Sequence, residues 1–257
     1  MQERLDYVTL QPKRIVDLGC GRGGSFPGLT TRYPAAELVG IDLVPAMLAG
    51  ADTSAAGWRR WLGLGRQSGP LRLAADAACV PLPSACASLL WSNLLLHWLD
   101  DPLSALAEAH RLLEADGLLM FSTFGPDTLR ELRTAFGDGR AHTQRFIDMH
   151  DLGDMLVGCG FADPVMDMEV ITLTYSDLDA LFADLRAAGA TCAMKSRSRG
   201  LAGRHAWTAA RMAYESMRQA GKLPATFEVV YGHAWKVAPK RLADGRAIIR
   251  FDRSKGR

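Results

Sequence analysis

The 257-residue sequence predicts a doubly wound α/β fold built on a mainly parallel, seven-stranded sheet, and three observations support this prediction. Short apolar runs alternate with helical patterns through the first half of the chain. A glycine-rich segment follows the first apolar run directly. The second half adds two further strand patterns that are separated by helical ones. Such alternation is typical of βαβ units, in which crossover helices cover both faces of a parallel sheet.

The first half contains five candidate strands with two helical patterns among the intervals. In the longer helical pattern, Leu103, Leu106, Ala107 and His110 recur every three or four residues, which predicts the face that packs on the sheet. The Asp116-Gly117 pair is expected to end this helix as a turn. The expected strands are residues 14–19, 37–42, 71–77, 87–93 and 117–124, and the expected helices are residues 45–51 and 102–115.

The pattern changes after residue 124. Two strand patterns remain, and helical patterns precede and separate them, so we expect an extension of the sheet and a C-terminal helical cap inserted before the last strand. The sequence thus divides into an expected core (1–124), a sheet extension with cap (125–237) and a basic tail (238–257). The expected strands are residues 164–175 and 225–237, and the helices are residues 126–136, 149–161, 176–190 and 204–221.

Composition and charge limit the classes of function. The chain is 48% hydrophobic and 23% charged, which is ordinary for a soluble protein, and no run of about 18 apolar residues predicts a membrane span. The five cysteines form no CxxC pair and no basic-then-apolar signal segment is evident, so a reducing cytoplasm is the expected compartment. We expect no partnership with nucleic acid or membrane.

Basic residues are concentrated in two places although the net charge is only +2. From Lys236 to the end there are eight Lys or Arg against two Asp, and we expect this tail to be solvated. The second cluster suits either a solvated loop or a surface that attracts an acidic macromolecule. Its members are Lys195, Arg197, Arg199 and Arg204.

The segment "VDLGCGRGG", residues 16–24, carries four glycines directly after an apolar run. Glycine lets backbone N–H groups approach a ligand that a Cβ would obstruct, so we interpret the segment as a ligand-binding loop. A P-loop requires GxxxxGK[ST], and no Lys-Ser or Lys-Thr follows here. Residues 19–24 nearly match the dinucleotide pattern GxGxxG, which is weak evidence by itself.

Two carboxylates distinguish between the possible ligands of this loop. Asp17 immediately precedes the glycines, and Asp42 ends the next expected strand. Negative charge so close to the loop would repel a pyrophosphate and would favour a cationic amino acid. The alternatives are that Asp17 is a capping group and that Asp76, after the third strand, is a turn residue.

With these segments in order, the sequence resembles the class I S-adenosylmethionine-dependent methyltransferases, and "VDLGCGRG" resembles their motif I. The resemblance implies a Rossmann-like fold and S-adenosylmethionine as cofactor. It also implies that the glycine loop and Asp17 lie at the methionine moiety, Asp42 at the ribose, Asp76 near the adenine, and Ser92 and Asn93 beside the sulfonium. The same segments supply the other expected cofactor residues, which are Gly19, Cys20, Gly21, Gly23, Leu43, Met47 and Ala77.

This chemistry needs little from side chains. A sulfonium already carries a good leaving group, so the protein has to hold the nucleophile in line with the methyl group and exclude water. A carboxylate acceptor is ionised near pH 7 and needs no general base. The six histidines show no spacing that requires a metal site, and we expect none.

The resemblance extends from about residue 14 to residue 236. The segments "VPLPSACASLLWSNLLLHW", "LVGCGFADPVMDMEVITLTY" and "ATFEVVYGHAWK" resemble the malonyl-acyl-carrier-protein O-methyltransferases of biotin synthesis. This implies methylation of the free malonyl carboxylate on an acidic carrier protein, to which the second basic cluster could bind. Within that interpretation, we expect Arg145 to pair with the carboxylate and His97 and Trp98 to line the acceptor side. A surface ion pair is the alternative for Arg145, and core packing is the alternative for Trp98.

Two other functions stay open at this point. The C-terminal segment also resembles a related assembly factor of mitochondrial respiratory complex I, which hydroxylates an arginine. A cofactor-binding partner protein without turnover is the other alternative. Only thirteen residues, Met1 to Lys13, precede the first expected strand, whereas the family carries a longer segment with a helix that closes over the cofactor. We therefore expect weak cofactor binding and free exchange.

Overall fold

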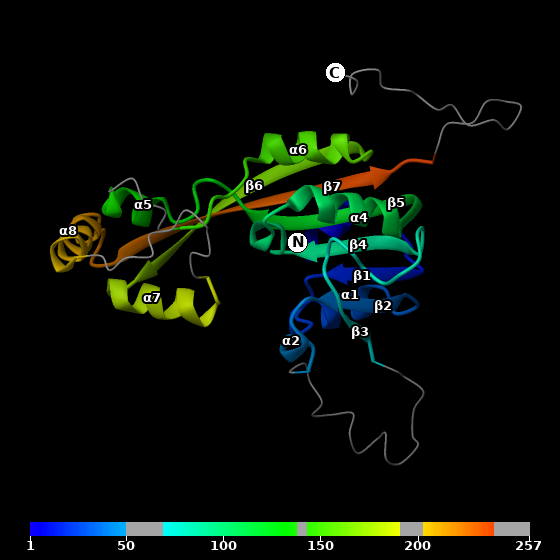
Figure 1. The fold of residues 1–257 in the computed structure, drawn as a ribbon, viewed down its shortest axis with the longest axis horizontal. Coiled ribbons are helices and arrows are strands. Elements are labelled where there is room, and N and C mark those ends of the chain that lie inside the picture. Colours follow the sequence, from blue (N-terminus) through cyan, green and yellow to red (C-terminus); the bar gives the residue numbers. More distant parts are fainter. Residues whose placement is uncertain (50–68, 138–142, 191–202, 239–257) are drawn as a thin grey trace, which may run out of the picture.

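The computed structural model describes residues 1–49, 69–137, 143–190 and 203–238. Its seven strands form one sheet in the order β3-β2-β1-β4-β5-β7-β6 (Figure 1). Strands β1 to β5 pair in parallel, whereas β7 is antiparallel to both β5 and β6, which confirms the predicted mainly parallel, doubly wound sheet. The strands are β1 (Arg14–Leu18), β2 (Glu37–Asp42), β3 (Leu71–Ala74), β4 (Ala87–Asn93), β5 (Leu113–Phe124), β6 (Ala162–Tyr175) and β7 (Leu223–Lys236).

Helices cover both faces of the sheet. Within the described residues, α1 has no counterpart among the predicted helices, because Pro27 and Gly28 obscure its pattern. Proline is compatible with the first turn of a helix, where its missing N–H would be unpaired anyway. The helices are η1 (Gln2–Tyr7), α1 (Phe26–Arg32), α2 (Pro45–Ala49), η2 (Leu96–Trp98), α4 (Pro102–Leu112), α5 (Arg130–Phe136), α6 (Met149–Gly158), α7 (Leu178–Ala187) and α8 (Arg204–Glu215).

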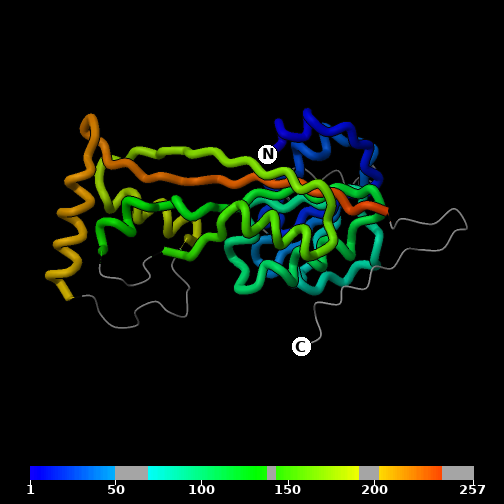
Figure 2. Tube along the Cα trace, turned by 90° about the horizontal axis from the view of Figure 1, so that it is seen from above, coloured from blue at the N-terminus to red at the C-terminus, as the bar shows by residue number. Residues whose placement is uncertain are grey.

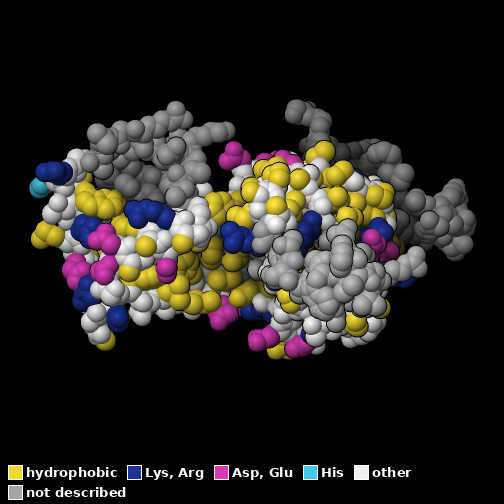
Figure 3. Space-filling model, turned by 90° about the horizontal axis from the view of Figure 1, so that it is seen from below, with side chains coloured by type: hydrophobic (Ala, Val, Ile, Leu, Met, Phe, Trp, Pro, Cys, Tyr) yellow, Lys and Arg dark blue, Asp and Glu magenta, His cyan; other side chains and the backbone are white. Residues whose placement is uncertain are grey.

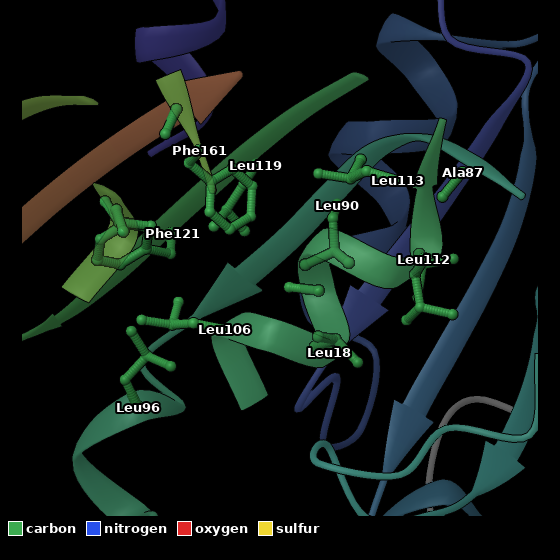
Figure 4. Close-up of a cluster of buried hydrophobic side chains, with 14 of the residues drawn as sticks. Leu18, Ala87, Leu90, Leu96, Leu106, Leu112, Leu113, Leu119, Phe121 and Phe161 are labelled. Atoms are coloured by element: carbon green, nitrogen blue, oxygen red, sulfur yellow. The ribbon is translucent and has the colours of Figure 1, made fainter. Parts of the chain in front are cut away.

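The two faces of the sheet carry separate apolar clusters because successive residues of a strand point to opposite sides. On β5, Leu119 and Phe121 join the cluster beneath α4 and α6 (Figure 4), whereas Leu118 and Met120 join the cluster beneath η1 and α1. Apolar side chains therefore cover both faces of the sheet, and this packing holds β1 in place where the glycine-rich segment follows it.

Helix α4 differs from its prediction in both face and length. Leu106 of the predicted face is buried on the sheet, but Leu103 is 45% exposed and Ala105 and Ala109 are buried instead, so the predicted face is only partly correct. The Asp101 side chain accepts a hydrogen bond from the Leu103 N–H at 3.1 Å and sets where the helix begins. The helix ends at Leu112 rather than at residue 115, because Leu113 already pairs with Ala87 of β4 as the start of β5.

The cap is carried by the two longest strands. Strands β6 and β7 run side by side well beyond β5, and α5, α7 and α8 gather at their far end (Figures 1 and 2). Helices α7 and α8 lie between β6 and β7 in sequence, as the prediction of an inserted helical cap requires. Leu132, Leu181, Tyr214 and Leu223 bury the contact between the helices and β7.

The carboxylates of Glu131 and Glu228 hold the cap on β7 through buried hydrogen bonds. The Thr226 N–H donates to Glu131 at 3.0 Å, and the Thr226 hydroxyl donates to the same carboxylate. The Asp127 N–H donates to the Glu228 carboxylate at 2.6 Å. These bonds align residues 125–131 with the part of β7 that β5 no longer reaches.

The division of the chain into a core and a cap at residue 124 stays a prediction. Across the described ranges, no helix is both long and apolar enough to span a membrane.

Candidate active site

The glycine loop joins β1 to α1 at the carboxyl end of the sheet. Gly19, Gly21 and Gly23 have φ angles of +72°, +53° and +82°, a region that side chains rarely adopt. A Cβ at Gly19 would lie 2.8 Å from Leu95. At Gly21, in contrast, a Cβ would meet nothing within 4 Å. The loop is therefore packed tightly on the protein side and presents bare backbone on the open side, as a ligand cradle requires.

Asp42 fixes this loop to the end of β2. One carboxylate oxygen accepts from the Gly21 N–H at 2.8 Å and the other accepts from the Val44 N–H at 2.9 Å. The Gly19 and Cys20 N–H groups both donate to the Ile41 carbonyl, at 2.8 and 2.9 Å. Each carboxylate oxygen has a further lone pair and can accept a bond from a ligand. Asp42 thus has a structural role in addition to any contact with the cofactor.

Asp17 lies beneath the loop and is only 1% exposed. Neither of its carboxylate oxygens has a hydrogen-bond partner, so it is no capping group. Burial, together with the negative charge of Asp42, raises its pKa well above 3.8, and the nearby Ser25 side chain opposes this shift without completing a hydrogen bond. The Ser92 hydroxyl is also buried without a partner. Unpaired buried polar groups are rare and indicate a functional site.

A pocket of about 380 Å³ opens above the loop. Among the predicted cofactor residues, Gly19, Cys20 and Asn93 line it. The Ser122 hydroxyl donates to the Asn93 side-chain oxygen at 2.7 Å, which fixes that amide and leaves its N–H₂ group available. The lining also includes Gly24 of the predicted loop and four residues that the sequence interpretation missed, namely Met1, Gln2, Ser25 and Trp91. Ser25 directly follows the glycines, a position that could have suggested it.

The other predicted cofactor residues lie beside this pocket rather than in its wall. Leu43 is 67% exposed and Met47 is also exposed, just beyond β2. One Asp76 carboxylate oxygen accepts from the Ala78 N–H at 2.9 Å, so Asp76 forms a turn, and Ala77 is buried in that turn. The other oxygen takes no part in this bond, and the predicted contact of Asp76 with the adenine stays a prediction. The Ala75 N–H donates to the Asp42 carbonyl at 3.1 Å and keeps this turn next to the end of β2.

A second and much larger cavity, of about 920 Å³, begins on the other side of the β4 end. His97 and Trp98 line it, and Trp98 is 46% exposed, which rules out core packing. Their role on the acceptor side stays a prediction. The His97 ring lies 4.7 Å from the ring of Phe124. Burial lowers the pKa of His97 to about 4, so this ring is neutral near pH 7. The near end of the cavity is therefore aromatic and uncharged.

Arg145 is an exposed side chain between two residues that line this cavity, Gln144 and Phe146. It makes no hydrogen bond or ion pair with any residue in the described parts of the chain, so the surface ion pair finds no support there. Of the second basic cluster, Arg204 is exposed at the start of α8, and Lys195, Arg197 and Arg199 lie outside the described residues.

Residues before β1 pack beside the cofactor pocket. Leu5 of η1 is fully buried, and the Gln2 amide donates to the Ser25 carbonyl at 3.5 Å. A Cβ on Gly28 would lie 2.1 Å from the Gln2 side chain, which shows how closely η1 approaches α1. Tyr7 is exposed and does not line the pocket. The expected weak cofactor binding stays a prediction.

The fold and the site define a methyltransferase of the Rossmann-like class. The methyltransferase domain family matches residues 16–121, from the glycine loop through most of β5. A solved structure of a putative methyltransferase from Bacillus halodurans shares the fold with a TM-score of 0.62 and 15% identity, covering 92% of this chain and 99% of that one. Haemonchus contortus phosphoethanolamine N-methyltransferase 2, solved in complex with S-adenosyl-L-methionine, aligns with a TM-score of 0.54 and 13% identity over 91% of this chain and 51% of that one.

Sequence relatives define the particular family. A malonyl-[acyl-carrier protein] O-methyltransferase of Gallionella capsiferriformans is 48% identical over 252 residues, which cover 97% of this chain and 86% of the relative. One from Laribacter hongkongensis is 49% identical over 256 residues, covering 98% of this chain and 86% of the relative. The chain belongs to the malonyl-[acyl-carrier protein] O-methyltransferase family. This membership confirms the resemblance inferred from the sequence.

Proposed function

We propose that this protein transfers a methyl group from S-adenosylmethionine to the free carboxylate of a malonyl group on an acyl carrier protein, a step of biotin synthesis. Family membership supports the reaction and the acceptor. The observation that carries the cofactor assignment is the buried, unpaired Asp17 beneath a loop of bare backbone. A cationic ligand above that loop offsets the cost of a buried negative charge, whereas a pyrophosphate would increase it.

The residues present fit this cofactor. The Gly19–Gly23 backbone would hold the methionine part, Asp42 has lone pairs free for hydroxyl groups, and the Asn93 amide presents donors at the end of β4. When bound, S-adenosylmethionine supplies a methyl group on a positively charged sulfur that is already a good leaving group. The chain therefore has to orient and enclose the reactants, and needs no catalytic base.

On the acceptor side, the uncharged rings of His97 and Phe124 would enclose the reactants, and the nearby Arg145 would orient them. The neutral His97 ring and Phe124 exclude water, which otherwise screens charges and competes as a hydrogen-bonding partner. Arg145, whose guanidinium is always charged, pairs with the malonyl carboxylate through a two-pronged hydrogen bond and aims one oxygen at the methyl group. Trp98 covers the open side of the same acceptor position.

The acidic carrier protein would approach over exposed basic residues of the cap. Arg204 is exposed at the start of α8 and supports this docking side. Lys195, Arg197 and Arg199 belong to the same basic cluster in the sequence and lie outside the described residues. Neither the hydroxylase alternative nor the partner protein without turnover is favoured by the family relationship. Both are outcomes of the test below.

The test is methyl transfer from labelled S-adenosylmethionine to malonyl-carrier protein, with succinyl-carrier protein as a competing acceptor. Ester formation is expected, and cofactor binding without ester would refute the function. Arg145→Glu should raise KM for the acceptor by about tenfold or more while cofactor affinity stays unchanged, because one charge-assisted pair is lost. Arg145→Lys keeps the charge and serves as the matched control. An equal loss of both affinities in Arg145→Glu would mean that Arg145 is structural.

A further inference from the structure

The large cavity under the cap is far more apolar than a malonyl group requires. Its volume of about 920 Å³ is near the upper end of the roughly 300–1,000 Å³ found for small-molecule sites. A malonyl group is short, so it would not fill such a space. Figure 3 shows hydrophobic side chains gathered at the waist between the cap and the rest of the sheet.

Two aromatic groups mark the ends of the cavity. At the near end, Phe124 packs against His97 at 4.7 Å and against Phe227 at 5.9 Å. At the far end, Trp207 of α8 stacks on Phe182 of α7 at 5.5 Å. Ile171, Leu173, Leu132 and Leu185 line the wall between these groups. The cavity is therefore a continuous and mostly apolar space that begins beside the β4 end and continues into the cap, with Asp184 and Arg186 as its charged lining residues.

A polar group in the wall, the Thr128 hydroxyl, is already paired within the protein. The Thr128 hydroxyl donates to the Glu228 carbonyl at 3.1 Å, and its oxygen accepts from the Glu228 N–H at 3.1 Å. A ligand with amide groups would have to bury them without partners, which is costly. An alkyl chain loses nothing in the same place and gains about fourfold in affinity for each CH₂ that it buries.

We infer that the cap cavity binds the alkyl chain of a free fatty acid, with the carboxylate at the His97 end, and that the protein methylates such acids as a second class of substrate. This inference rests on the proposed methyl transfer. A carboxylate oxygen forms the new O–CH₃ bond while the S–CH₃ bond breaks and leaves its electron pair on sulfur. The negative and positive charges cancel, no proton moves, and the product is a fatty acid methyl ester.

The first measurement is direct binding of hexanoate, decanoate and tetradecanoate to the purified protein by calorimetry, without cofactor. Affinity should rise by up to about fourfold per CH₂ until the cavity is filled. The second measurement is methyl ester formation from the same acids with labelled S-adenosylmethionine, where kcat/KM should follow the same order. Affinity that does not depend on chain length would overturn the alkyl site, and binding without ester formation would overturn the second activity.

A matched pair of variants on β6 locates the site. Leu173→Trp fills part of the cavity and should shift the preference to shorter acids, with at least a tenfold loss for tetradecanoate. Val170→Trp changes an equally exposed residue of the same strand outside the cavity wall, and it should behave like the unmodified protein. Equal effects of the two variants would refute this location. Malonyl-carrier protein is assayed in parallel, so a failure of the proposed function appears there and a failure of this inference appears only with fatty acids.

Discussion

Asp17→Asn removes the charge beneath the glycine loop while keeping the size of the side chain. Burial raises the pKa of Asp17, so the folded protein keeps this proton at pH values at which the unfolded chain has lost it. The protonated Asp17 side chain contributes to the free energy of unfolding in full below the ordinary pKa of 3.8, and this contribution is lost as pH rises through the raised folded-state pKa. Near neutral pH, the free energy of unfolding therefore carries a penalty that the asparagine variant avoids.

The Asp17 oxygens have no hydrogen-bond partner within the described residues, and this sets the size of the effect of Asp17→Asn on stability and on cofactor affinity. An unpaired buried polar group costs about 1–3 kcal/mol, and a charge costs more. Asp17→Asn should thus raise the free energy of unfolding of the cofactor-free protein by about 1 kcal/mol or more near pH 7. The same change removes the negative charge that favours the cationic cofactor, so affinity should fall roughly tenfold to a hundredfold.

The assay combines denaturant unfolding of the cofactor-free protein at several pH values with calorimetry of S-adenosylmethionine binding. Asp42→Asn is the control, because Asp42 accepts two backbone N–H bonds and an amide can accept only one of them. It should lower stability by about 1 kcal/mol, opposite in sign to Asp17→Asn. An Asp17→Asn protein that is no more stable than the original near pH 7, or that binds the cofactor equally well, would refute this explanation.

Three further predictions concern the acceptor wall, the loop and the cap. Burial lowers the pKa of His97 to about 4, so the free energy of unfolding should fall by up to about 3 kcal/mol as pH drops from 6.5 toward 4. His97→Phe should abolish this loss, which acid denaturation curves would show. Gly23 has a φ of +82°, and Gly23→Ala places a Cβ 2.6 Å from the Phe26 ring, so the free energy of unfolding should fall by about 1–3 kcal/mol, measured by thermal unfolding. Gly24→Ala is the control, because its Cβ would face open space, and it should be nearly neutral. Thr226→Val removes a donor to a buried carboxylate of α5 and should cost about 1–3 kcal/mol, with the exposed cross-strand Thr172→Val as control; equal stabilities would contradict the role of this bond.

Local sequence patterns were sufficient for the cofactor side of the molecule. The glycine loop was predicted from residues 16–24 because glycine lets the backbone approach a ligand closely. The structure adds that Gly19, Gly21 and Gly23 have φ values of +72°, +53° and +82°, which glycine adopts without strain. Asp42 was predicted as the acid that ends the second strand, where it lies. The parallel sheet followed from the alternation of strands and helices, because each crossover helix must return the chain to the same end.

Periodicity was insufficient where tertiary contacts choose between similar faces. In α4, Leu106 packs on the sheet as predicted, but Ala105 and Ala109 are buried there in place of Leu103 and Ala107. This difference arises because contacts with the sheet decide which of two neighbouring helix faces is buried, and such contacts leave no periodic trace in the sequence. The place of Asp76 near the adenine stays a prediction, because its bond to the Ala78 N–H occupies only one carboxylate oxygen.

The sequence by itself determined the class of protein, the alternation of its strands and helices, and the backbone cradle for the cofactor, because each depends on residues close together in the chain. The tertiary structure alone decided that Asp17 is unpaired and that His97 is neutral, because burial is set by distant segments. It also decided the apolar cavity, whose wall combines η2, α5, β6, α7, α8 and β7. No local pattern can encode a space that exists only after these segments have packed together.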